Sequence, residues 1–397
     1  MLPIDFVLWP MKLTALYTVA VGFVLIGLGL GHATPTFPLY EQPTKSDLLT
    51  FSEMKGAHEE SISSTGVVSH TQTYRSKPLP LGEGEVVFTD PKRTPLIMPT
   101  GNIALTRFHA FVVDETGRSV PLNEVYNHHW LVFNGRGNAG VCGGYLSYVF
   151  GVGAESRDSP VEFPENYGLV LNGSEEWGAN IHLLRTVNTM NVKNCIECVY
   201  TPEKGCAKEQ SGKFACCGDG SYCQLTKDGN RSETKTYFLQ YSVTWVDVYA
   251  NLIPLEIMVL DASGCEIEYN IEASNTAPVH TTTFSWTSKH TGEIVYGTGH
   301  QHIGALNISL FLDGQCVCTN VPKYGNGTTA GNEKGYVVQI DTCDFENNSV
   351  LVRAGQTVSV TSLYDVSPND QRGLPHGGGA HGGVMSLFYL GVAMKHD

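Results

Sequence analysis

Short apolar runs separated by turn residues recur along the chain from about residue 77 onwards. The first half contains "GEVVF", "HHWLVF" and "ANIHLLRT", and the pattern resumes after residue 232 with runs such as "TYFLQYSVTWVDV". Runs of this length, bounded by Gly, Asn and Asp, are typical of β-strands, and "DETG" predicts a hairpin. The pattern therefore predicts an all-β fold of two consecutive antiparallel β-sandwich, jelly-roll-like domains at residues 77–232 and 233–397.

The chain before residue 77 has a different pattern. Residues 13–30 are apolar and uncharged, with Lys12 before them and a small-x-Ala sequence after them, so residues 1–34 are predicted to be a secretory signal peptide. The apolar segment is nearly long enough to cross a membrane, which leaves an uncleaved signal anchor as the alternative. Both interpretations place the body outside the cytosol, secreted or in the lumen of the secretory pathway. Residues 35–76 are polar and lack apolar periodicity, which predicts a tail or linker.

Composition narrows the possible partners. The 43 glycines and the low share of charged residues, 16%, favour the all-β interpretation. The formal net charge of −14 comes without a basic stripe, which argues against binding to nucleic acid or to an anionic membrane surface. A membrane partner is expected only if the N-terminal segment is an uncleaved anchor.

Eleven cysteines in a secreted chain predict disulfides before metal sites. Six of them lie together and predict a stapled loop, with a zinc knuckle as the alternative: Cys195, Cys198, Cys206, Cys216, Cys217 and Cys223. Five cysteines lie elsewhere in the chain: Cys142, Cys265, Cys316, Cys318 and Cys343. Because five is an odd number, one of them must be unpaired or bonded outside the chain, and the sequence does not show which one. Five glycosylation sequons agree with secretion: Asn172, Asn230, Asn307, Asn326 and Asn347.

Adjacent histidines stand inside one predicted strand, at His128 and His129. Successive side chains of a regular strand point to opposite faces, so one ring would be interior and the other exposed. The two rings can converge on one metal ion only if the strand bulges or ends there. His182, a solitary polar residue in another apolar run, would complete a three-nitrogen site suited to copper or zinc.

A second group of candidate ligands lies in the second half. His300 and His302 are spaced i, i+2 at a strand start, so both rings share one face. Met385 alternates with Leu387 and Tyr389 on a later strand, and two imidazoles with a thioether form a soft site that favours Cu(I). Two histidines on the glycine-rich approach to that strand are alternative ligands or orienting groups: His376 and His381. Seven others receive no chemical role: His32, His58, His70, His109, His280, His290 and His396.

The ligand order HH, H, HxH, M over two sandwiches resembles the type II copper, ascorbate-dependent monooxygenases, represented by peptidylglycine α-hydroxylating monooxygenase and dopamine β-monooxygenase. The resemblance implies two copper ions. It assigns His128, His129 and His182 to an electron-transfer site. It assigns His300, His302 and Met385 to an oxygen-binding site, and it places Tyr389 along the substrate cleft.

The chain departs from the peptide enzyme at two substrate contacts. Thr298 stands where that enzyme has an arginine that holds the substrate carboxylate, and Leu387 stands where it has an asparagine. These differences argue against a peptide C-terminus as substrate and indicate a less polar cleft.

A closer resemblance is to the stress up-regulated nodulin family. It rests on "YNHHW", "GHQHIG", "YGNGTTAGNEKGY" and "GVMSLFY", and it runs from about residue 85 to 394. The family's name records induction and supplies no reaction.

Three functional hypotheses follow. The first is a copper monooxygenase that hydroxylates a C–H bond of a small apolar molecule with O₂ and a reductant such as ascorbate. The second is a non-catalytic extracellular copper-binding stress protein with the same fold. A glycan- or protein-binding sandwich with incidental histidines is a third possibility, since fold alone does not exclude it. No GxSxG, P-loop, HExxH or GxGxxG motif in a suitable context suggests other chemistry.

Overall fold

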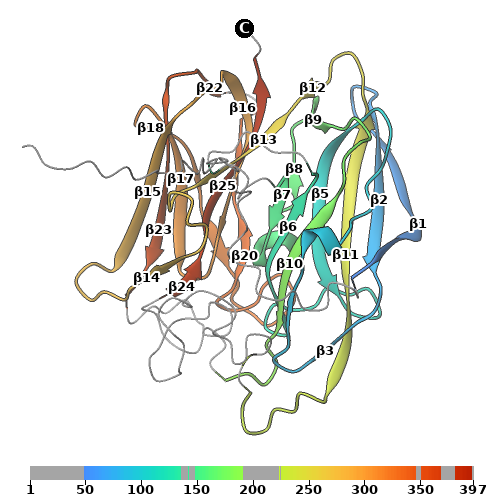
Figure 1. The fold of residues 1–397 in the computed structure, drawn as a ribbon, viewed down its shortest axis with the longest axis vertical. Helices are drawn as coiled ribbons and strands as arrows, with labels where there is room; N and C mark the ends of the chain where they lie inside the picture. The colour runs from blue at the N-terminus through green and yellow to red at the C-terminus, as the bar shows by residue number, and fades with distance from the viewer. Residues whose placement is uncertain are drawn as a thin grey trace, which may run out of the picture. The chain divides into compact units, whose positions relative to one another are not determined.

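The computed structural model describes residues 49–135, 142, 148–190, 223, 225–345, 350–367 and 381–395. Over these residues the regular elements are β-strands and two short 3₁₀ helices, η2 (Pro91–Arg93) and η4 (Ala154–Arg157), with no α-helix among them (Figure 1). The predicted all-β fold is confirmed. The predicted signal segment, most of the Cys-rich stretch and His376 lie outside the described residues.

The largest sheet combines strands from three parts of the sequence. Its strand order is β1 (Phe51–Ile62), β2 (Val68–Ser76), β11 (Thr234–Asp247), β5 (Ile103–Val113), β9 (Tyr167–Val170) and β12 (Ile253–Pro254). Two further strands attach to this path, β3 (Leu79–Gly82) to β11 and β8 (Val161–Glu162) to β5.

This sheet corrects two of the predicted boundaries. The prediction of a polar tail to residue 76 is wrong from residue 51 onwards, because 51–62 and 68–76 are strands. The boundary near residue 232 is also misplaced, since β11 begins at Thr234 yet pairs with both β2 and β5. Tyr74 of β2 stacks on Tyr241 of β11 with ring centroids 5.0 Å apart, so the hairpin contributes to the core.

A second sheet packs against the first. It has the order β4 (Val86–Phe88), β10 (Gly178–Arg185), β6 (Val125–Phe133) and β7 (Phe150–Val152). Phe108 of β5 stacks on Phe150 at 4.8 Å, and Trp130 of β6 meets Tyr241 edge-on at 6.0 Å. All four side chains are fully buried, so this aromatic layer joins the two sheets.

The second half of the chain forms another pair of sheets. One has the order β13 (Glu256–Asp261), β25 (Ser386–Met394), β16 (Gly292–Gln301) and β21 (Thr342–Asp344), with β22 (Val350–Val352) on β16. The other has the order β15 (Val279–Thr287), β23 (Thr357–Asp365), β17 (Ala305–Leu312) and β18 (Gln315–Asn320). Two small ladders join β14 (Tyr269–Ile271) to β24 (His381–Val384) and β19 (Pro322–Tyr324) to β20 (Val337–Ile340). Ile294, Leu310 and Phe388 are fully buried in the core between the larger sheets.

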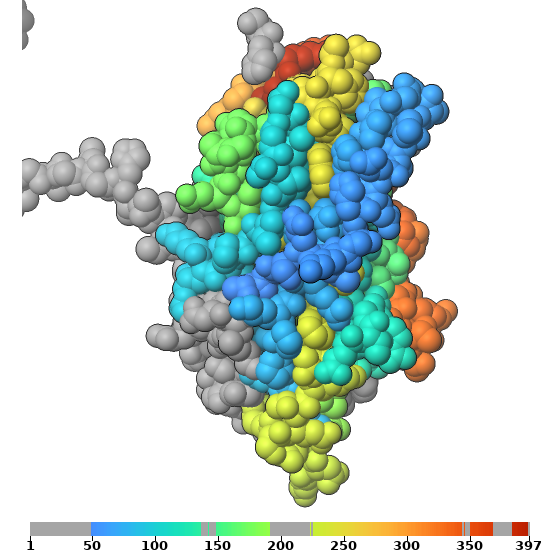
Figure 2. Space-filling model, turned by 90° about the vertical axis from the view of Figure 1, so that its right-hand side faces the viewer, coloured from blue at the N-terminus to red at the C-terminus, as the bar shows by residue number. Residues whose placement is uncertain are grey.

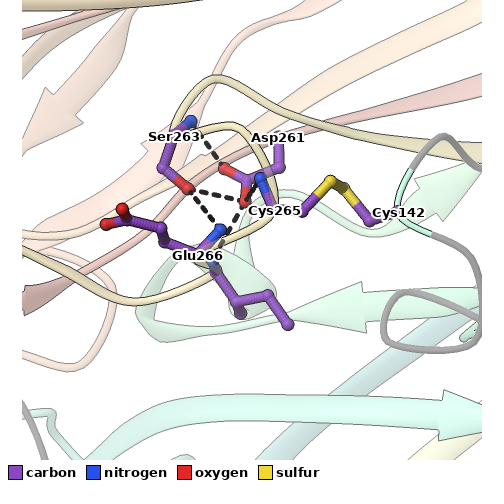
Figure 3. Close-up of a disulfide and its surroundings, with 6 residues drawn as sticks. Cys142, Asp261, Ser263, Cys265 and Glu266 are labelled. Atoms are coloured by element: carbon purple, nitrogen blue, oxygen red, sulfur yellow. Dashed lines mark hydrogen bonds between the residues drawn. A yellow bond between two sulfur atoms is a disulfide. The ribbon is translucent and has the colours of Figure 1, made fainter. Parts of the chain in front are cut away.

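Two disulfides connect described parts of the chain. Cys142 is bonded to Cys265, and the turn that carries Cys265 is organised by the Asp261 carboxylate, which accepts hydrogen bonds from the backbone of Ser263 and Cys265 (Figure 3). Cys318 is bonded to Cys343. Among the cysteines in the described ranges, the exposed Cys316 is the free thiol. Within the described ranges, no helix has the length and apolar character needed to cross a bilayer.

Candidate metal centre

The paired histidines of β6 stand at a β-bulge. Asn127 pairs with Leu183 and His129 pairs with His182, so His128 is an extra residue on β6 with no opposite partner in β10. A bulge re-aims the side chain that it carries, which lets neighbouring residues turn toward one side. The Nδ1 atoms of His128 and His129 lie 3.3 Å apart. The local irregularity that convergence of the two rings requires is therefore present.

His182 brings a third imidazole from the neighbouring strand. Its ring centroid is 4.4 Å from that of His128, and one ligand nitrogen of each of the three histidines lies within 4.8 Å of the others. All three side chains are buried. Two nitrogens of a tetrahedral site with metal–nitrogen bonds of 2.0–2.1 Å lie about 3.3 Å apart. The separation of the His128 and His129 nitrogens has this value, so the pair fits one metal ion with little movement.

A buried amide holds the ring of His129. The Oδ1 atom of Asn180 lies 2.8 Å from His129 Nε2, while the Asn180 amide nitrogen donates to the Thr89 carbonyl at 2.6 Å. Because the amide nitrogen is committed to Thr89, Oδ1 must face the imidazole and accept its Nε2 proton. This arrangement leaves Nδ1 of His129 as the nitrogen with a lone pair for a metal.

Burial keeps these imidazoles neutral. It lowers the pKa of His129 to about 4, with the hydrogen bond to Asn180 opposing the shift and the charge of His300 adding to it. Burial also lowers the pKa of His128 and of His182 well below 6.5, and neighbouring histidines push both further down. Since a metal binds the neutral imidazole, the site needs no deprotonation at neutral pH.

His300, at the end of β16, is held by an acidic residue of η4. Its Nδ1 donates to Oε1 of Glu155 at 2.8 Å, and both side chains are buried. A carboxylate on one ring nitrogen fixes the tautomer and leaves the other free to bind a metal. Within the described structure Nε2 of His300 has no hydrogen-bond partner. Gly153 makes the approach possible, because a Cβ there would lie 2.5 Å from the His300 ring.

His302 connects the two predicted ligand sets. Its ring centroid is 5.3 Å from that of His300 and 4.5 Å from that of His128. The sequence divides the ligands into a set on the first sandwich and a set on the second, but the five rings form one buried group. We call His128, His129, His182, His300 and His302 the five-histidine cluster.

Met385 and Tyr389 are buried in the hydrophobic core. The Met385 side chain belongs to the hydrophobic core and is 1% exposed. Its carbonyl accepts a hydrogen bond from the Tyr364 hydroxyl, which in turn accepts one from the backbone N–H of His302. Tyr389, expected along a cleft, is also buried, and its hydroxyl occupies the space that a side chain at Gly151 would need.

Several residues that organise the site were not identified from the sequence. Glu155 and Asn180 orient imidazoles, Gly153 admits His300, and Tyr364 links the chain beside His302 to Met385. The sequence signal for Glu155 is weak, a single acid after a Gly-rich stretch, "FGVGAES". His381 lies in β24, which places its backbone next to Ile271.

The chain is thus an all-β protein with disulfides and a buried group of five imidazoles. The family model described as "Stress up-regulated Nod 19" matches residues 67–136 and 133–395. The chain therefore belongs to the stress up-regulated Nod 19 family. Among curated proteins, none matches it.

Solved structures show only distant likeness. Peptide:N-glycanase F (PNGase F) is 8% identical with a TM-score of 0.32, over 87% of this chain and 96% of that one. PNGF-II is 10% identical with a TM-score of 0.27, over 88% and 66% of the two chains. BpGH86A, a β-porphyranase from Bacteroides plebeius, is 8% identical with a TM-score of 0.19, over 89% and 38%. Scores this low define neither a common topology nor a common activity.

Proposed function

We propose that this protein binds copper in the five-histidine cluster and acts in an extracellular or secretory compartment. Its disulfides indicate an oxidising location. The observation that carries the proposal is the convergence of three buried imidazoles, His128, His129 and His182, on one point. Imidazole ligands suit both copper and zinc, and at equal availability the order of divalent affinities favours Cu²⁺.

The residues around the cluster would prepare it for the metal. Asn180 presents Nδ1 of His129, and Glu155 presents Nε2 of His300. The carboxylate of Glu155 also places a negative charge beside the imidazoles, which would offset part of the charge of a bound ion. Copper bound there would supply one-electron redox chemistry.

Metal content tests the binding proposal. Purified protein exposed to equal copper and zinc, then dialysed, should retain copper at the cluster. Glu155→Gln, which removes the charge that holds His300, should weaken copper binding at that histidine by about 10–100-fold. His290→Ala, a change at an exposed histidine, is the matched control and should leave the copper content unchanged. Protein that retains no copper, or that retains zinc in preference, would refute the proposal.

Hydroxylation of a small apolar molecule is the second candidate function. The contact between His302 and His128 favours it, because it places a ligand of each predicted copper set side by side. Oxygen uptake driven by ascorbate should then require both sets, so His129→Ala and His300→Ala should be about equally inactive. If copper-loaded protein forms no hydroxylated product from a broad panel of phenols, alcohols and amides, hydroxylation is refuted and only the copper-binding function remains.

A further inference from the structure

A second, separate group of metal-binding side chains lies on the hairpin of β1 and β2. His58 and Glu60 are spaced i, i+2 on β1, and His70 of β2 stands opposite Glu60 in the register. Alternation along a strand places the three side chains on one face. The Oε1 atom of Glu60 is 3.3 Å from His70 Nδ1 and 3.7 Å from His58 Nε2. One ligand atom from each residue lies within 4.8 Å of the others.

Trp245 of β11 holds the two imidazoles in place. Its ring stacks on that of His70 with centroids 5.6 Å apart, and the ring of His58 lies 5.9 Å away. The imidazoles also stack on one another at 5.6 Å. Rings ordered by stacking lose less conformational freedom when they bind a ligand. The imidazoles of His58 and His70 are thus partly ordered before a ligand binds.

We propose that His58, Glu60 and His70 bind a zinc-class divalent cation, with the remaining coordination position open to water. Ligands of a tetrahedral zinc site lie about 3.3 Å apart when the bonds are 2.0–2.1 Å. The two distances to Glu60 differ from this value by a few tenths of an ångström at most. Two imidazoles and one carboxylate form a ligand set that zinc accepts, and the side chains of His58 and Glu60 are about half exposed, so solvent reaches the site.

A surface ion pair is the simpler explanation of the same geometry. An exposed ion pair of this kind contributes at most about 1 kcal/mol to the stability of the fold, and one imidazole on the carboxylate is enough to form it.

A metal site would also have a structural consequence, because the pairing of β1 with β2 is interrupted between Glu53 and His58. A cation bound beyond this irregularity would fasten the outer half of the edge strand to β2. Both strands are blue in Figure 2 and lie on the surface of the molecule.

Accessibility separates this site from the five-histidine cluster. The histidines of the cluster are 5% exposed or less, whereas the side chains of His58 and His70 are 47% and 22% exposed. Diethyl pyrocarbonate, which modifies accessible unliganded imidazoles, therefore reports on the hairpin and leaves the cluster largely unmodified. The proposal does not depend on copper binding in the cluster, and either one can fail alone.

The experiment is mass-spectrometric mapping of histidine modification in the full chain, with and without an excess of zinc sulfate. Zinc at about ten times its dissociation constant should slow modification of His58 and His70 together by about tenfold, since bound sites do not react. His290, which is exposed and remote in sequence, is the internal control and should react equally in both conditions. Equal modification of His58 and His70 with and without zinc would overturn the proposal, and this comparison needs no variant.

A pair of matched variants sharpens the test. Glu60→Gln keeps the size of the side chain but removes the anionic ligand, so protection by zinc should be lost. Glu59→Gln makes the same change on the neighbouring exposed residue, which alternation directs to the opposite face of β1, and protection should persist. Equal protection in the two variants would mean that the carboxylate of Glu60 is not a ligand.

Discussion

The buried histidines should make the metal-free protein sensitive to mild acid. His129 is the clearest case, because burial lowers its pKa from 6.5 to about 4. In the unfolded chain the imidazole takes up a proton near its ordinary pKa, whereas in the folded protein it stays neutral until the pH approaches 4. The stability contributed by the neutral group is therefore fully present above pH 6.5 and is lost as the pH falls toward the folded pKa.

The magnitude follows from the difference between the two pKa values. Each unit is worth 1.36 kcal/mol, so His129 alone accounts for about 3 kcal/mol in total and about 2 kcal/mol between pH 7 and pH 5. His128 and His182 shift in the same direction and add to the loss. Since a domain is stable by only about 5–15 kcal/mol, acid alone should bring the protein close to unfolding.

Urea unfolding of metal-free protein at pH 7, 6 and 5 measures the effect. His129→Gln replaces the imidazole by an amide that does not titrate, so the loss between pH 7 and pH 5 should shrink by about 2 kcal/mol. His290→Gln alters an exposed histidine and should keep the full pH dependence of the native chain. A native protein whose free energy of unfolding stays constant or rises from pH 7 to pH 5 would refute the burial of neutral imidazoles.

Three substitutions test other parts of the structure. Gly153→Ala should cost about 1–3 kcal/mol in urea unfolding and lower copper affinity at His300, because the added methyl meets that ring at 2.5 Å; unchanged stability and affinity would contradict this contact. Cys142→Ser removes the disulfide to Cys265, which closes a loop of 123 residues. The entropy of the opened loop should lower the free energy of unfolding by about 5 kcal/mol, and a loss smaller than about 1 kcal/mol would contradict this estimate. Met385→Ile keeps an apolar core residue but removes the thioether that the sequence predicts as a soft ligand. If that prediction holds, the change should weaken Cu(I) binding without unfolding, and equal Cu(I) affinity would leave Met385 as core packing.

The sequence predicts the strands whose buried face carries an apolar alternation, and it misses those whose buried face is partly polar, such as β2, or largely absent, such as β1. β1 is exposed along most of its length, so no apolar alternation marks it, and its presence depends on pairing with β2. β11 has clear alternation, yet its place in the first sheet depends on long-range pairing with β5. Periodicity reports burial of a face, and it carries no information about which distant strand a segment will join.

The candidate site shows the same division. The sequence shows that adjacent histidines need a bulge, and β6 has one at His128. It also identifies His182 as a possible partner, which β10 places opposite His129. The sequence does not identify Glu155 and Asn180, because neither residue has a neighbouring sequence pattern that indicates its distant partner, His300 or His129. Their roles come from tertiary contacts, which a single sequence does not record.

The contact between His128 and His302 changes how the cluster should bind its ions. Ligand sets on separate sandwiches would load independently, but these ring centroids are 4.5 Å apart. Two ions held within one cluster would repel one another, and at an effective dielectric constant of 20 unit positive charges repel by about 1.4 kcal/mol, about tenfold in affinity, even when about 12 Å apart. The Glu155 carboxylate beside His300 offsets only part of this repulsion. Copper titration of the metal-free protein should therefore show two unequal steps, the second weaker by about tenfold or more. Glu155→Gln should widen the gap, whereas two equal and independent steps would mean that the ions do not share one cluster.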